Sequence, residues 1–353
     1  MRRINHYIGV NVAGSIIVVL LVIVALDVIA MLVDQLDNLK GNYSFKEAVV
    51  FTLLSVPASV YEFLPLACLV GCLIGLGLLA NTSELTVIRA AGVSVVRIIW
   101  AVMRPVLVFI LMALLLGEYV TPTLNQYAES RRAIALGHKT ALTGQRGVWN
   151  KEGKEYMHFS AVLPNGKLLG VTRMLFDVFG RLLTMTYVES AIYQGDHWFE
   201  QEGVVTQLSA GEIDTQKFDS RRWQTEISPK LLSVIALQPS DLPMQRLLPY
   251  AEYLEKQGQN GKEYRLAFWQ KFFQPLATLS LVIIAISFVF GPLRQVTMGF
   301  RVFAGVIVGL TFQMAQDLLG PSSILFGFAP LIAVLLPITI SVLVGVLLLR
   351  RSV

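Results

Sequence analysis

The sequence has little cysteine, histidine or charge for its length. Its two cysteines, Cys68 and Cys72, lie in one apolar run, and the polar middle of the chain has none. They indicate helix packing rather than a disulfide or a metal site. The four histidines are scattered and form no His-Glu-x-x-His motif, which argues against a zinc centre. Charged residues make up 15% of the 353 residues and hydrophobic residues 54%, so the composition indicates an integral membrane protein.

The sequence also lacks a loop that could cradle nucleotide phosphates. Residues 258–263 are the nearest candidate, but the glycine spacing is wrong and no Ser or Thr follows the lysine. We therefore expect no nucleotide hydrolysis by this chain. No Ser or paired Asp lies in a setting typical of an intramembrane protease. Asp27 is the one acid deep enough in an apolar run to require a partner, and this scarcity argues against a proton-coupled transporter.

What the sequence does have is apolar runs long enough to cross a membrane. In the second run, residues 49–80, Pro57 and Pro65 predict an interfacial helix before a spanning part at 63–80. Arginines flank the runs on one side, which predicts that both termini are cytoplasmic. The six predicted spans are residues 10–33, 63–80, 98–120, 272–290, 302–319 and 328–349.

The region between the third and fourth spans has a different pattern. Residues 125–268 contain most of the Lys, Asp and Glu residues, and apolar residues there alternate with period two. Strands are predicted at 155–163, 168–179, 182–193 and 197–208, separated by turns that contain glycine. We expect a β-sandwich or jelly roll on the periplasmic side. The predicted fold is therefore an α-helical membrane protein with six transmembrane helices (1–124 and 269–353) and an inserted all-β periplasmic jelly-roll-like domain (125–268).

Residues 81–99 form a short amphipathic segment between two spans. Its apolar residues recur at helical spacing, but its polar residues are too many for a span. We expect a helix at the membrane surface near residues 82–91, which Asn81 caps together with Glu84. Such a helix could receive force from a soluble partner.

Several short motifs resemble those of the LptF/LptG permease family of the lipopolysaccharide exporter, and within it most resemble LptG. The resemblance covers the whole chain. The motifs are TLLSVP at 52–57, GLGLLA at 75–80 leading to Ser-Glu-Leu at 83–85, Gly-Glu at 117–118, FQPL at 273–276, FGPLR at 290–294, Met-Gly at 298–299 and Gly-Pro at 320–321.

The resemblance implies a permease subunit of an ABC transporter, driven by a separate ATPase. That ATPase would be an LptB-like dimer that carries the ATP and Mg²⁺, while this chain holds no cofactor. Further implied partners are an LptF-like permease, LptC-like and LptA-like periplasmic bridge proteins, the inner membrane and lipopolysaccharide; no nucleic acid is implied. The ATPase would contact the surface helix, which here offers Ser83, Glu84, Leu85 and Arg89, together with Arg294 after the fourth span.

By the same resemblance, the first and fifth spans form a lateral gate for the lipid. Leu32 and Ile307 are candidate residues for the acyl chains, and Asp27 of the first span is a further candidate lipid-binding residue. Lipid phosphates need cations near the outer leaflet, for which Lys40, Arg131 and Arg132 are candidates. Solvated surface charge is the alternative interpretation of these three.

Three other functions stay open at this point. A mechanotransmission-type ABC subunit would move no lipid through its spans. A lipid-modifying membrane enzyme would need a cluster of acids, His or Ser in the outer domain, which the sequence does not suggest. A passive assembly scaffold would not stimulate an ATPase.

Overall fold

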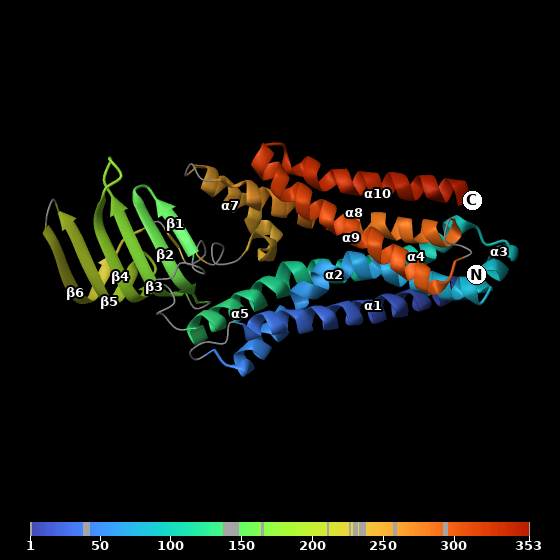
Figure 1. The fold of residues 1–353 in the computed structure, drawn as a ribbon, viewed down its shortest axis with the longest axis horizontal. Coiled ribbons are helices and arrows are strands. Elements are labelled where there is room, and N and C mark those ends of the chain that lie inside the picture. The colour runs from blue at the N-terminus through green and yellow to red at the C-terminus, as the bar shows by residue number, and fades with distance from the viewer. Residues whose placement is uncertain are drawn as a thin grey trace.

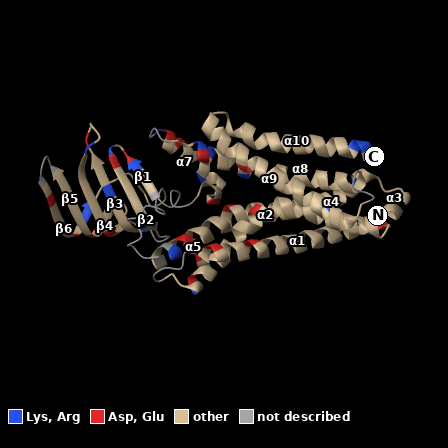
Figure 2. Ribbon diagram, in the orientation of Figure 1, with Lys and Arg blue, Asp and Glu red and all other residues tan. Residues whose placement is uncertain are grey.

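The computed structural model describes residues 2–37, 43–136, 148–163, 166–209, 212–225, 227–228, 232, 238–256, 260–291 and 296–352. Long helices lie side by side, a β-sheet stands beyond one end of them, and both chain termini lie at the other end (Figure 1). We call these the sheet end and the terminal end. Charged residues gather on the sheet and at the sheet end of the helices (Figure 2).

Within the described ranges, six helical stretches are long and apolar enough to span a membrane. They follow the order of the six predicted runs. The helices concerned are α1 (Arg2–Leu36), α2 (Phe45–Asn81), α4 (Val95–Leu115) continued by η1 (Leu116–Val120) and α5 (Thr121–Leu136), α8 (Lys262–Phe290), α9 (Met298–Phe326) and α10 (Pro330–Ser352). Gly327 ends α9 in the left-handed conformation at φ +79°, and Pro330 begins α10.

The second helix differs from the prediction. We expected the prolines to separate an interfacial helix from the span, whereas α2 is one continuous helix that contains both Pro57 and Pro65. Neighbouring helices pack around α2, the most buried of the six, and such packing lets a membrane helix tolerate proline. The third helix also extends beyond its apolar run, with a π-helical turn at Leu116–Val120 before α5.

The inserted domain is one antiparallel sheet in the order β1-β2-β3-β4-β5-β6. Its strands are β1 (Val148–Glu152), β2 (Glu155–Val162), β3 (Lys167–Phe176), β4 (Leu182–Tyr193), β5 (Trp198–Ser209) and β6 (Glu212–Trp223). The four predicted strands are confirmed within a few residues, and the edge strands β1 and β6 were missed. Each described strand pairs with the next along the chain. Period-two alternation predicts strands but does not fix their order.

The helical part and the sheet each have their own apolar core. The helical core includes Ile16, Leu69 and Ile98 from three different helices. The sheet has its own core around Trp198 and Phe159. A short helix, α7 (Met244–Lys256), follows the sheet and packs Leu247 and Tyr250 against the beginning of α8.

Candidate functional site

The surface helix exists as α3 (Glu84–Ala90), at the terminal end of the molecule (Figure 1). Two residues, Thr82 and Ser83, separate it from α2, and Ser83 takes the left-handed conformation at φ 61°. The chain therefore turns sharply between the helices. Gly92 follows α3 at φ +83°, a conformation that suits glycine at a helix end.

The start of α3 is not capped as predicted. Asn81 is the last residue of α2 and does not cap α3, while Ser83 occupies the N-cap without a side-chain hydrogen bond. The Glu84 carboxylate instead accepts a hydrogen bond of 3.2 Å from the Thr82 hydroxyl. The capping box fails because the tight turn leaves Asn81 inside the preceding helix.

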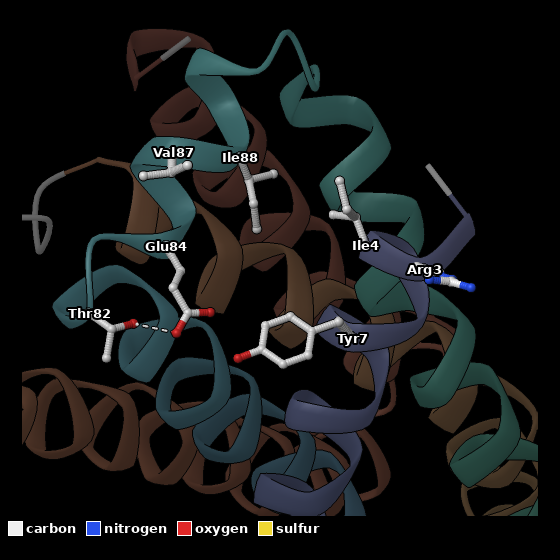
Figure 3. Close-up of a pocket in the computed structure, with 7 residues that line it drawn as sticks. All are labelled: Arg3, Ile4, Tyr7, Thr82, Glu84, Val87 and Ile88. Carbon is white, nitrogen blue, oxygen red and sulfur yellow. Dashed lines mark hydrogen bonds between the residues drawn. The ribbon is translucent and has the colours of Figure 1, made fainter.

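An open groove of about 410 Å³ separates α3 from the first turns of α1. Figure 3 shows the Glu84 side chain directed into this groove toward the hydroxyl group of Tyr7. The groove is lined by Arg3, Ile4, Tyr7, Thr82, Glu84, Val87 and Ile88. Its lining is mostly apolar with charged groups at two places, an arrangement that suits the surface of a protein partner.

The predicted residues of α3 have distinct surroundings. Leu85 is buried and holds the helix against the core, so it is not available to a partner in this state. Ser83 is exposed and Glu84 partly exposed. The guanidinium of Arg89 lies 5.8 Å from the ring centroid of Phe290, at the end of α8. Thus α3 is joined to α2 by a tight turn, lines a groove with α1 and contacts α8. Arg294 lies outside the described residues.

The candidate lipid cations lie at the sheet end. The Arg131 guanidinium makes two hydrogen bonds to the Glu47 carboxylate of α2, at 2.6 and 2.9 Å. Arg132 is buried, with its guanidinium 4.9 Å from the ring centroid of Phe51. An incoming phosphate would have to compete with Glu47 for Arg131. Lys40 lies outside the described residues.

The apolar candidates lie on the helices that the rest of the molecule covers least. Among the six candidate spans, α9 and α1 have the smallest buried share. Ile307 on α9 is exposed and Leu32 on α1 is half-buried. Asp27 of α1 has a partner within this chain, because its carboxylate accepts a hydrogen bond of 2.6 Å from the hydroxyl of Ser59.

Sequence reasoning missed a polar junction where the chain returns from the sheet to the helices. Glu118, on the π-helical turn, accepts a 2.7 Å hydrogen bond from the backbone N–H of Met244 at the start of α7. Buried Lys271 of α8 donates to the Leu242 carbonyl at 2.7 Å. Nearby, burial raises the pKa of Asp241. The Gly-Glu motif was the one sequence signal here, and it did not reveal these distant partners.

Nothing in the described part of the chain forms a group of three His, Cys, Asp or Glu side chains placed to hold a metal ion.

Comparisons with known proteins agree with this arrangement. The family model described as lipopolysaccharide export system permease LptF/LptG matches residues 6–351. The chain is 34% identical over 352 residues to the lipopolysaccharide export system permease protein LptG of Escherichia coli strain K12, covering 99% of this chain and 98% of that protein. It is 33% identical over 340 residues to the LptG protein of Haemophilus influenzae, covering 96% and 95% of the two chains. With its helical core and inserted β domain, the chain belongs to the LptF/LptG family of lipopolysaccharide export permeases.

Proposed function

We propose that this chain carries lipopolysaccharide from the outer leaflet of the inner membrane along its spans, driven by an ATPase that binds α3. It is a multi-pass inner membrane protein and a non-catalytic permease subunit. ATP and Mg²⁺ then belong to an LptB-like partner. An LptF-like permease completes the lateral gate, and LptC-like and LptA-like proteins receive the lipid.

The observation that carries this proposal is the position of α3. It lies at one tip of the helical bundle, is joined to α2 by a turn of two residues, faces α1 across the groove and contacts α8 through Arg89. A displacement of α3 would therefore act on α1, α2 and α8 together. Arg350 and Arg351 end α10 at this same tip, which supports a cytoplasmic location by the positive-inside rule.

The exposed faces of α1 and α9 support the path for lipid. Phe303, Ile307 and Met314 of α9 are all exposed, and α1 exposes a similar aliphatic face that includes Val18 and Leu21. Exposed apolar faces of this kind suit acyl chains or a second permease. Narrowing the space between these faces and the second permease would move the lipid toward the sheet end.

The test is charge reversal at the groove. Glu84→Arg should abolish lipopolysaccharide export while the complex still assembles, because a basic partner surface would then face a cation. Glu255→Arg is the matched control: Glu255 is exposed on α7 at the sheet end, where it pairs with Arg265 at 2.8 Å. Export by the Glu84→Arg variant at the level of the control would refute the role of α3.

A further inference from the structure

A buried arginine connects the start of α9 to the end of α2. Arg301 is 2% exposed, although the sequence suggested only an arginine flanking a span. Its Nη1 atom donates hydrogen bonds of 3.3 Å to the Gly77 carbonyl and to the Asn81 side-chain oxygen. A guanidinium held against two uncharged oxygens in a buried position is costly to displace.

The neighbouring residues make this contact close and specific. A Cβ atom at Gly77 would lie 3.3 Å from Nη1 of Arg301, so glycine leaves the space that the guanidinium uses. The amide nitrogen of Asn81 also donates to the sulfur of Met298 at 3.9 Å. Both ends of the Asn81 amide thus contact the first turn of α9.

The position of Asn81 in the chain connects α3 to the contact with Arg301. Asn81 ends α2, and α3 begins at Glu84. A displacement of α3 therefore reaches Asn81 through a turn of two residues. Asn81 then contacts Arg301 of α9. One helical turn later, at Gly305, α9 packs closely against Leu73 of α2.

The outward face of the same part of α9 carries Phe303 and Ile307, both exposed. A movement of Arg301 would therefore shift the face that the proposed function assigns to lipid. This step rests on the proposed function for the identity of the lipid, but the contact itself does not depend on it.

We propose that Arg301 is a positioning residue that links the surface helix α3 to α9, the fifth span and a side of the lateral gate, through Asn81. Movement of α3 then shifts α9 at the same time as it moves α2. Without the link, α3 still binds the partner ATPase, but its displacement no longer moves α9.

The experiment uses the purified complex of this permease with its partner subunits, loaded with lipopolysaccharide. A photo-crosslinking residue at position 307 reports the yield of lipid adduct before and after trapping the ATPase with ATP and vanadate. The wild-type complex should show a change of several-fold. Arg301→Met and Asn81→Ala should reduce that change to less than half of the wild-type response, with ATP hydrolysis within about twofold. Asn81→Asp keeps an acceptor for the guanidinium and should retain the response.

Arg104→Met is the matched control, because Arg104 is an exposed arginine on α4 and its loss removes the same charge. A wild-type response in both Arg301→Met and Asn81→Ala would overturn the link. Should Arg301→Met fail to assemble, Asn81→Ala decides alone, since Asn81 is exposed. If the wild-type complex gives no lipid adduct, or the same adduct yield before and after trapping with ATP and vanadate, the proposed function is overturned instead.

Discussion

The helical bundle and the sheet use their charged side chains differently. In the bundle, side chains of two different helices meet in polar contacts: Asp27 with Ser59, Arg131 with Glu47, and Arg301 with Asn81. In the sheet, one arginine serves several strands. Arg173 of β3 forms ion pairs of 2.9 Å with both Glu155 of β2 and Glu200 of β5.

The difference predicts how far the loss of one side chain spreads. Loss of one of these contacts in the bundle changes the pairing of two helices. Loss of the shared cation in the sheet leaves carboxylates on two other strands without their guanidinium. We infer that a single substitution can disturb more elements in the sheet than in the bundle.

The largest expected effect is the loss of the shared cation. Arg173→Met leaves the fully buried Glu200 and the partly buried Glu155 without their guanidinium. Burial already raises the pKa of Glu200. Removing one partner of a buried pair costs about 3–5 kcal/mol, so sheet amides should exchange hydrogen much faster while helix amides do not change.

Arg181→Met is the control for this variant. Arg181 is mostly exposed and pairs with Asp177 in a turn of the same sheet. An exposed pair contributes at most about 1 kcal/mol, so exchange in the strands should be nearly that of the wild type. Equal exchange in the two variants would contradict the shared network.

A smaller effect is expected from helix packing. A Cβ atom at Gly71 of α2 would lie 2.6 Å from the Cα atom of Ile16 in α1, so Gly71→Ala must separate the two backbones. Overpacking of this kind costs about 1–3 kcal/mol. Thermal unfolding in detergent should start at a lower temperature.

The matched change is Gly14→Ala in α1, where no atom beyond the adjoining turns of the same helix lies within 4 Å of the added Cβ. That variant should be as stable as the wild type or slightly more stable, because alanine favours a helix. The packing explanation would be wrong if both variants lowered the unfolding temperature equally.

Much of the architecture follows from local sequence patterns. Long apolar runs predicted the six helices, and period-two alternation predicted β2 to β5. The edge strand β6 was missed because residues such as Lys217, Asp219 and Arg221 fill it with charge. The continuity of α2 through its prolines depends on packing against other helices, which no local pattern reveals.

The site was predictable only in part, for a related reason. The position of α3 follows from its amphipathic pattern. The partners of the candidate residues, in contrast, lie 84 residues apart for Arg131 and Glu47 and 220 residues apart for Arg301 and Asn81. Only the folded bundle brings them together.

The smallest expected effect concerns a turn of the sheet. Backbone hydrogen bonds from Arg181 and Phe179 lower the pKa of Asp177, with the Arg181 contact the larger cause. The carboxylate therefore stabilises the turn above the ordinary pKa of about 3.9, and this contribution is lost as the pH falls through the lowered value. The Phe179 amide resonance should titrate below about pH 3.9 and should not titrate in Asp177→Ala. A midpoint at or above the ordinary value would contradict the turn geometry.

The most direct test of the central claim is photo-crosslinking in cells from Leu32, Arg132 and Ile307, with the adducts probed for lipopolysaccharide. We predict lipopolysaccharide adducts at Leu32 and Ile307 that disappear when the partner ATPase is inactivated. Adducts at Arg132 alone, or at none of these positions, would contradict a lipid path along the spans.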